Sequence, residues 1–442
     1  MFPDRQTICA NLGLGERLLE ERVERYGGRA VNGAMKYVCD AAAERMMLAL
    51  EALPDGTWEG EDAVDCDGVD DDESYRVHVK VTKRGGRAEI DLSGTSRQAR
   101  SCINGTVLDA KTTVGITFKY LFDPRTPFTS GTIRPIDVVI PEGTIVSALP
   151  PDGAVFLYWE GTQALMAALL RALGQVLGEA AIGGDHGSAN LHNAHGVLPE
   201  GRPWVSVGQC GGEQGALGAS ADGDGEAFTL TYQANGIAPA IEATEYDVPV
   251  AILRHEVVPD TAGPGRHRGG AGVVRDSLWL QPAAHHAMPL RFRVPSGFGV
   301  NRGRDGRPGG VWLWEPGGGG VAWRRDGADA YRDAIPVTGR LDPETNAPSP
   351  DGEYVWFGRQ PIWRTEPLAT LRYVSNAGGG FGDPLEREPE RVRRDVRDGY
   401  VTIEGAARDY GVVVTGDPED DPEGLAVDLE ATERLRRSRR EE

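Results

Sequence analysis

The sequence predicts an α+β fold in which mixed, mainly antiparallel sheets pack with helices and carry long glycine-rich loops. Three observations predict it. Some segments repeat apolar residues every three or four positions, as helices do, and others alternate apolar with polar residues, as half-buried strands do. The chain of 442 residues also holds 60 glycines, which indicate backbone at positive φ or in close approach to another group. We expect these loops to be shaped at a site or at a subunit interface.

Bulk composition narrows the class of protein. A chain of 442 residues can form two or three domains with a well-buried core. Its net charge of −20 argues against nucleic acid and against an anionic membrane as partners, since both need a basic surface. The five cysteines are too far apart for a Cys-x-x-Cys motif, and no apolar run approaches the ~20 residues that span a bilayer. We therefore expect a soluble, cytoplasmic protein with reduced thiols.

Residues 1–60 are expected to form a helical N-terminal segment. Residues 14–26 are charged and helical in pattern, and they end at two glycines. A second helix is expected over residues 32–53, where apolar residues repeat at a spacing of four and form one stripe along the helix. The turn Pro54-Asp55-Gly56 ends this helix.

Residues 61–415 are expected to form an α+β body. Alternating apolar residues predict antiparallel strands over residues 75–81 and 88–92, and the acidic stretch 65–73 before them is expected to be a solvated hairpin loop. Further strands are expected over residues 133–140, 248–258, 272–280, 311–314 and 368–374. Further helices are expected over residues 109–122, 162–177 and 388–397.

Residues 416–442 are expected to form a charged, mobile C-terminal helix or tail. The helix covers residues 425–440, where Glu430 and Arg434 lie four positions apart in the favourable order. The sequence therefore favours a frayed helix on the surface of the protein.

The densest polar cluster lies at residues 183–196 and includes Asp185, His186, His192 and His195. Imidazole and carboxylate groups together suit zinc or manganese, so the three histidines are candidate metal ligands. Their spacing fits no standard metal motif, and the segment is expected to be a loop. The alternatives are a hydrogen-bonded turn that lines a pocket and a plain surface loop.

Glu160 is a candidate for two roles. It directly precedes the helix expected over residues 162–177, where a carboxylate benefits from the positive end of the helix dipole. It is therefore a candidate capping group and a candidate acid or base. The glycine-rich stretch 378–382 lacks the Gly-Lys-Ser/Thr sequence and the following helix of a phosphate-binding loop, so we do not expect a nucleotide to bind there.

Two further polar groups carry weaker signals. Glu242 is a pocket candidate because it lies near Glu245, and paired carboxylates can share a proton or hold a cation. Alternation along a strand would place these two glutamates on opposite faces, which weakens the pairing. His285 and His286 are adjacent and would also point in opposite directions, so we expect a surface turn there rather than a pair of ligands.

Several short segments occur together in one order. Residues 259–272 read Pro-Asp-Thr-Ala-Gly-Pro-Gly-Arg-His-Arg-Gly-Gly-Ala-Gly, and residues 378–384 read Gly-Gly-Gly-Phe-Gly-Asp-Pro. The other segments are residues 91–96, 131–136, 141–143 and 409–412. Together they resemble the B subunit of hydantoinases and 5-oxoprolinases, a family related to the acetone and acetophenone carboxylase subunits. The resemblance covers the chain from about residue 10 to residue 415.

The resemblance also bears on the site. The family has a Glu-Thr-Ser-Gln segment at the position of residues 160–163, which read Glu-Gly-Thr-Gln here. The resemblance therefore makes Glu160 a candidate catalytic residue and Gln163 a pocket candidate.

The resemblance implies partners. In this family a separate subunit, or a fused domain, binds ATP and phosphorylates the amide or carbonyl oxygen of the substrate, which gives a poor electrophile a good leaving group. This sequence contains no ATP-binding motif, which fits that division of labour. Family members also carry an N-terminal region with an Asn-Asp-Pro segment and a His-Leu-x-Asp type metal site, and neither motif occurs here. The resemblance therefore places ATP on a hydantoinase A-type partner. It places a divalent metal, zinc or manganese, on a separate N-terminal metal-bearing B fragment or on a missing N-terminal region.

Three functions are compatible with these features. The first is a subunit of an ATP-dependent cyclic-amide hydrolase of the hydantoinase or 5-oxoprolinase type. The second is a subunit of an ATP-dependent ketone carboxylase, which shares the activation chemistry. The third is a non-catalytic scaffold subunit that completes such a complex.

Overall fold

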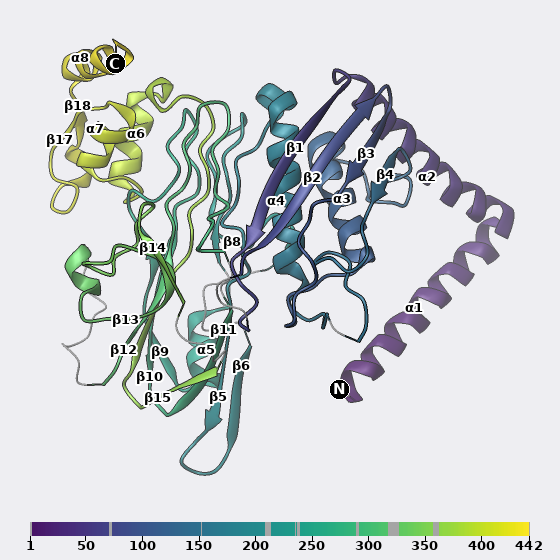
Figure 1. Cartoon of the computed structure of the whole chain (residues 1–442), viewed down its shortest axis with the longest axis horizontal. Coiled ribbons are helices and arrows are strands. Elements are labelled where there is room, and N and C mark those ends of the chain that lie inside the picture. The colour runs from purple at the N-terminus through teal and green to yellow at the C-terminus, as the bar shows by residue number, and fades with distance from the viewer. Residues whose placement is uncertain are drawn as a thin grey trace.

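The computed structural model confirms an α+β fold built mainly of antiparallel sheets (Figure 1). It describes residues 2–69, 73–151, 153–207, 214–234, 236, 239–288, 291–316, 327–356 and 362–441. A sheet with its own helices lies at one side of the molecule, two further sheets lie beside it, and a small C-terminal helical unit packs at the far end. None of the helices formed by the described residues has a stretch long and apolar enough to cross a bilayer.

Two helices precede the first sheet, as predicted. Helix α1 (Phe2–Tyr26) and helix α2 (Gly28–Glu51) both begin earlier than expected and are separated by Gly27, whose φ of 81° breaks the helix. Helix α1 projects away from the body, and its main contact with another element is with α2 (Figure 1). Its apolar side chains Ile8 and Leu12 are therefore exposed. Only the second half of α2 reaches the core, through Ala42, Met46 and Leu50.

The first sheet has the strand order β1-β2-β3-β4. Its strands are β1 (Gly56–Val64), β2 (Tyr75–Arg84), β3 (Arg87–Asp91) and β4 (Ile136–Val139). Strands β1 to β3 are antiparallel neighbours, and β4 runs parallel to β3. The alternating burial of β2 confirms the predicted half-buried strand, with Val77, Val79 and Val81 facing the core.

Two helices cover this sheet. Helix α3 (Val107–Phe122) begins at Thr106, whose hydroxyl accepts from the Asp109 backbone N–H while the Asp109 carboxylate accepts from the Thr106 N–H. Helix α4 (Tyr158–Leu177) lies directly on β1 and β2. Gly60 on β1 allows this contact, because an added Cβ there would lie 2.2 Å from the Ala168 carbonyl oxygen. The strand and the helix thus pack backbone against backbone near Ala168.

The second half of the chain forms two sheets packed face to face. The larger has the strand order β14-β13-β12-β16-β10-β9, and the smaller has the order β15-β11-β5-β6. The strands of the larger are β14 (Glu353–Trp356), β13 (Ile335–Leu341), β12 (Gly310–Trp314), β16 (Thr370–Val374), β10 (Val273–Trp279) and β9 (Val250–Val257). Those of the smaller are β15 (Ile362–Thr365), β11 (Ala283–Met288), β5 (Leu191–Val197) and β6 (Pro203–Val207). Side chains from both sheets share one core, including Trp204, Trp279 and Leu371.

The remaining elements are short. Strands β7 (Gly215–Ala216) and β8 (Ala227–Thr229) pair with each other, and helix α5 (Ile241–Asp247) precedes β9. The C-terminal unit contains helices α6 (Pro389–Arg397), α7 (Ile403–Tyr410) and α8 (Leu429–Glu441) with strands β17 (Val414–Thr415) and β18 (Ala426–Val427). Helix α8 is tied to this unit, since Arg436 donates to the carbonyl oxygens of Tyr410 and Arg387. The expected boundaries at residues 60 and 415 stay a prediction.

The glycine-rich segments pack backbone against backbone. An added Cβ at Gly379 would lie 1.8 Å from the Phe298 carbonyl oxygen, and one at Gly269 would lie 1.9 Å from the Gly378 carbonyl oxygen. The Gly379 N–H also donates to the Gly184 carbonyl oxygen at 2.9 Å. Glycine is needed in this layer because no other residue lets main chains approach so closely.

This layer differs from the loops that the glycine content predicted at a site or an interface. Residues 371–382 are buried, and within residues 376–382 only Gly382 has a positive φ, at 75°. Glycine clusters look alike in a sequence whether they shape an exposed loop or an interior contact, because both need the space that a side chain would take.

A buried network of charges joins the C-terminal unit to the body. The Arg387 guanidinium donates to both carboxylate oxygens of Asp224, at 2.7 and 2.8 Å, and to Asp395 at 2.7 Å. Arg268 donates to the other oxygen of Asp395 at 2.9 Å, and Arg391 is a second arginine whose guanidinium donates to Asp224, at 2.8 Å. Side chains from three distant parts of the chain therefore depend on one another.

This network predicts a loss of stability in acid. Burial alone would raise the pKa of Asp224, but the hydrogen bonds and charges of its arginines outweigh burial and lower the pKa to about 2. A carboxyl group whose pKa is lower in the folded chain stabilises it above the unfolded pKa, and that contribution is lost as pH falls from about 4 to about 2. We expect a loss of about 2 kcal/mol in the free energy of unfolding across this window, measured by urea denaturation. Asp224→Asn should be less stable at neutral pH and should lose less in this window, and an unchanged slope would contradict this account.

Candidate functional site

Glu160 belongs to a buried polar centre, which also contains Asp62, Asp65, Ser188 and Arg291. It is the third residue of α4, and the N-cap position Leu157 makes no side-chain capping bond. The Glu160 side chain is fully buried, and its Oε1 atom accepts a hydrogen bond from the Ser188 hydroxyl at 2.9 Å. Because the carboxyl group turns inward to Ser188, the capping role considered for Glu160 is wrong. Its catalytic role stays a prediction.

Glu160 is protonated at neutral pH. Burial raises its pKa to about 8, and the nearby negative charge of Asp65 adds to the effect. The hydrogen bond from Ser188 and the positive charge of Arg291 act in the opposite direction but are weaker. A carboxyl group with a pKa near the working pH can donate and accept a proton, which is the property that general acid–base catalysis needs.

Asp65 and Arg291 are the charged groups that act on this carboxyl group, and Asp62 binds Arg291. Asp62 and Asp65 lie in and just after β1, and both are buried. Asp62 accepts a hydrogen bond from Nη2 of Arg291, with neither side chain exposed, and Arg171 lies 3.5 Å from its other oxygen. Asp65 accepts from three successive backbone N–H groups, those of residues 292–294. Burial raises the pKa of Asp65 to about 6, so the centre holds two carboxyl groups, Asp65 and Glu160, whose pKa values lie near neutrality.

The loop at residues 183–190 supplies Ser188, the hydrogen-bond donor to Glu160. Ser188 also accepts from the Asn190 backbone N–H at 2.9 Å, and Asn190 has a φ of 50°, which few non-glycine residues adopt. The Asp185 carboxylate accepts from the backbone N–H groups of Gly187 and Tyr232, at 3.0 and 2.8 Å. The part of the cluster at residues 183–190 is thus a hydrogen-bonded turn, one of the alternatives considered.

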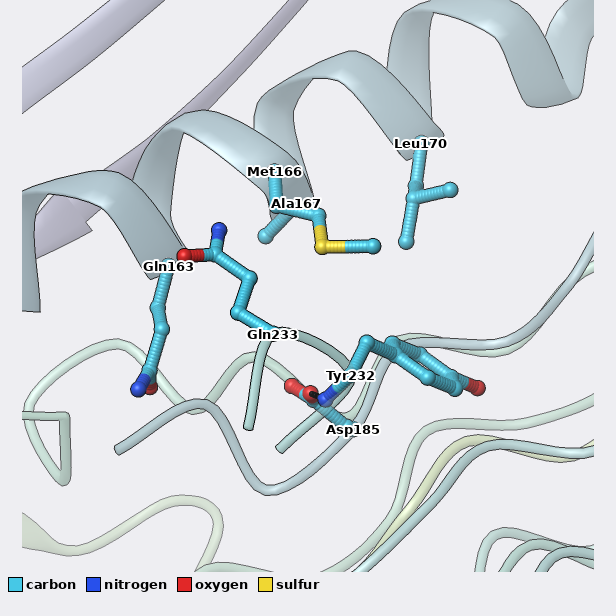
Figure 2. Close-up of a pocket in the computed structure, with 8 residues that line it drawn as sticks. Gln163, Met166, Ala167, Leu170, Asp185, Tyr232 and Gln233 are labelled. Atoms are coloured by element: carbon cyan, nitrogen blue, oxygen red, sulfur yellow. Dashed lines mark hydrogen bonds between the residues drawn. The ribbon is translucent and has the colours of Figure 1, made fainter. Parts of the chain in front are cut away.

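A small pocket borders the centre. Its cavity volume is about 10 Å³, room for about one water molecule, between α4 and the loops that carry Asp185, Tyr232 and Gln233 (Figure 2). From α4 it is lined by Gln163, Met166, Ala167 and Leu170. Gln163 is one helical turn after Glu160 and is 5% exposed, and its Oε1 atom has no hydrogen-bond partner among the described residues. Gln163 and Asp185, both pocket candidates from the sequence, do lie on this pocket.

The three candidate metal ligands are not brought together. His186 lies in the turn, where its Nδ1 atom is 3.1 Å from the Ala216 carbonyl oxygen. His192 and His195 are on strand β5, not in a loop, and three positions apart they face opposite sides of it, so His192 is buried and His195 is exposed. Among the described residues, no three His, Cys, Asp or Glu side chains form a group that could hold a metal ion.

His192 instead joins a buried pair. Its Nε2 atom is 3.0 Å from Nδ1 of His285, and Nε2 of His285 is 2.9 Å from the Thr365 hydroxyl. Burial holds the pKa of His285 well below its usual range, so this imidazole is neutral at physiological pH. The expected surface turn at His285 is therefore wrong. The residue lies inside β11, where the cross-strand partners of a histidine cannot be read from its own segment.

Other expectations fail for similar reasons. Glu242 and Glu245 precede strand β9 as expected, but they lie on helix α5 rather than in an extended segment, and both are exposed. Glu242 does not line the pocket, and Glu245 accepts the Ile252 backbone N–H at 2.7 Å. The acidic stretch expected to be solvated begins with Asp65 and Asp67, which are buried. Residues 70–72 of that stretch, and Cys210, lie outside the described residues.

Sequence reasoning missed most of the centre. Asp62, Ser188 and Arg291 carry no motif of their own, and they come from segments that are far apart in the chain. One signal was available: carboxylates at residues 62, 65 and 67 lie in and directly after the end of a strand whose last two residues are apolar. Charged residues at the inner end of a buried strand are more often paired than solvated.

Known proteins resemble this chain over most of its length. The sequence model of the hydantoinase B/oxoprolinase family matches residues 2–384. The putative B subunit of a D-/L-hydantoinase from Pseudomonas sp. (strain NS671) is 28% identical over 449 residues, which cover 98% of this chain and 67% of that protein. The beta subunit of a caprolactamase from Pseudomonas jessenii is 28% identical over 409 residues, which cover 91% of this chain and 64% of that protein.

A solved structure shares the fold. The nucleotide-free structure of acetone carboxylase superposes with a TM-score of 0.74 at 21% identity, covering 96% of this chain and 58% of that one. The chain thus spans about two thirds of the length of the relatives it matches, or less. The resemblance found in the sequence is confirmed, because the family match extends across both halves of the fold and the centre between them. The chain belongs to the hydantoinase B/oxoprolinase family.

Proposed function

We propose that the chain is a subunit of an ATP-dependent enzyme that hydrolyses cyclic amides. The observation that carries this proposal is the buried, neutral carboxyl group of Glu160, placed beside a pocket and held by Ser188. The relatives named as hydantoinase and caprolactamase subunits support the substrate class, since hydantoins and caprolactam are cyclic amides.

The chemistry divides between subunits. An amide carbonyl is a poor electrophile, and its phosphorylation by a hydantoinase A-type partner with bound ATP would activate it. In this proposal Glu160 moves the proton that accompanies attack on the activated carbon, because its pKa of about 8 lets it exchange a proton near neutral pH. Gln163 would orient the substrate, since a carboxamide can both donate to and accept from a cyclic amide.

We place the divalent metal, zinc or manganese, on another polypeptide or on a region beyond this chain. The described residues do not fit such an ion, because they bring no group of three candidate ligands together. No step of the proposed chemistry on this chain therefore runs through a metal.

The role of Glu160 can be tested in the complex reconstituted with its ATP-binding partner. Glu160→Gln keeps the shape of the side chain and removes its exchangeable acid proton, so substrate turnover should fall about 100-fold or more. The free energy of unfolding should not fall. In the wild type Glu160 ionises above about pH 4.5 in the unfolded chain but only above about pH 8 in the folded chain, and this difference lowers the stability between the two pH values. Glutamine does not ionise, so the variant avoids this loss. Turnover is measured as ATP hydrolysis stimulated by 5-oxoproline or a hydantoin.

Glu344→Gln is the matched control, because Glu344 is exposed in a turn far from this centre in the chain. It should leave turnover unchanged. Equal turnover in Glu160→Gln and the wild type, with the subunits still associated, would rule out a catalytic Glu160.

Ketone carboxylation is the second candidate, and the shared fold with acetone carboxylase favours it. The same complex would then hydrolyse ATP with a ketone and bicarbonate, and cyclic amides would have no effect. A complex whose ATP turnover responds to neither substrate class would favour the third candidate, a scaffold subunit.

A further inference from the structure

We propose that Glu160 and Arg291 form a buried binding site for one oxygen of a small oxyanion, a phosphoryl or carboxyl group. This inference deepens the proposed function and rests on it. A phosphorylated amide carries phosphoryl oxygens, and the product of amide hydrolysis carries a carboxylate. A subunit that completes such a reaction needs donors for these oxygens.

Arg291 supplies the first donors. Its side chain is fully buried, and only Nη2 is bound, by Asp62. The Nε and Nη1 atoms have no hydrogen-bond partner among the described residues. Unpaired N–H groups of a buried guanidinium are costly, and the planar fork of arginine suits carboxylate and phosphate oxygens. Two of its donors are thus available to a ligand.

Glu160 supplies a further donor. Its Oε1 atom accepts from Ser188, so Oε1 acts as the carbonyl oxygen and the acid proton is carried by Oε2. The Oε2 atom has no hydrogen-bond partner among the described residues. A neutral carboxyl group in this position donates to an anionic oxygen, whereas an ionised one would repel it.

The charges around the two residues favour this arrangement. Arg291 and Asp65 are the charged groups with the strongest influence on Glu160, and Asp62 and Arg171 complete the set around Arg291. When Glu160 is neutral, the charges of these two arginines and two aspartates sum to zero. An added anion therefore meets donors and no net negative charge.

The pocket beside α4 lies next to Glu160 along the helix. Gln163 lines it one turn after Glu160, and Asp185 lines it three residues before Ser188. Both oxygens of Asp185 are occupied by backbone N–H groups, so this carboxylate does not compete for Arg291.

Binding of sulfate and of acetate to the intact chain tests the proposal. Sulfate represents a phosphoryl group and acetate a carboxyl group, and both keep their charge from about pH 6.5 to about pH 9.5. Affinity is measured by calorimetry at both pH values, with chloride at matched ionic strength as the reference. For at least one anion we expect wild-type affinity to fall tenfold or more at the higher pH, because the neutral fraction of Glu160 falls about tenfold per pH unit above its pKa.

The Glu160→Gln variant tests whether the pH dependence of anion affinity comes from Glu160. Glutamine keeps a neutral donor at every pH, so its affinity for the same anion should change less than about twofold between the two pH values. Glu344→Gln should behave like the wild type. Absence of binding by both anions, or an equal pH dependence in the wild type and Glu160→Gln, would overturn the site. Because no partner, ATP or substrate is present, this result is independent of whether the complex hydrolyses cyclic amides.

Discussion

Gly379→Ala is expected to prevent the chain from folding, or to destabilise it by more than about 4 kcal/mol. The added methyl group would lie 1.8 Å from the Phe298 carbonyl oxygen and 2.8 Å from the Gly299 backbone nitrogen. Both neighbours are main chain, so no side chain can rotate away. The layer would have to separate and would lose hydrogen bonds such as that from the Gly379 N–H to Gly184. Thermal or urea unfolding followed by circular dichroism measures the loss.

Gly33→Ala is the matched control. Gly33 lies inside helix α2, is exposed, and has no atom within 4 Å of an added Cβ. Alanine should stabilise that helix by about 0.5–1 kcal/mol, because glycine is a poor helix former. If Gly379→Ala unfolded at the wild-type urea concentration, close backbone packing could not be the reason for glycine at residues 376–382.

Arg291→Met is expected to cost about 3–5 kcal/mol, the second large effect. Methionine fills much of the volume of the arginine stem but leaves the Asp62 carboxylate buried with the Ala63 backbone N–H and the distant contact to Arg171, at 3.5 Å, as its partners. Asp65 also loses a neighbouring positive charge. The free energy of unfolding at neutral pH measures the effect.

The double variant Asp62→Asn/Arg291→Met separates charge from packing. It removes both partners, so much of the lost stability should return, because no uncompensated charge stays buried. A double variant as unstable as the sum of the two single variants would mean that Arg291 acts through its packing alone.

The regular elements could be predicted because their signals are local. Helix α4 follows from leucines spaced four apart, and β2 follows from the alternating valines at residues 77, 79 and 81. Helix α5 was missed because its seven residues give too few turns for a periodic pattern. Strand β5 was missed because histidine, asparagine and glycine hide the alternation of buried and exposed positions at residues 191–197.

The site was predictable only in part. Glu160 and Gln163 share a short segment, so one pattern in the sequence could point to both. Arg291 meets Asp62 across 229 positions of the chain, and nothing near either residue reveals the other. Histidines drew attention by their chemistry, yet His192 proved to be bound to His285 from a neighbouring strand. Pairing across sheets depends on topology, which a single sequence does not state.

Helix α4 contacts both the inner surface of the first sheet and the polar centre. Leu165 and Leu169 anchor it in the core that it shares with β1 and β2, while Glu160 and Gln163 project from its first turns. A helix is stiff along its axis, so a displacement at one end of α4 also moves its other end. Substitution of the core leucines, far from the pocket, could therefore change which sizes of substrate the proposed enzyme accepts. A search for variants with altered specificity should include this leucine face of α4.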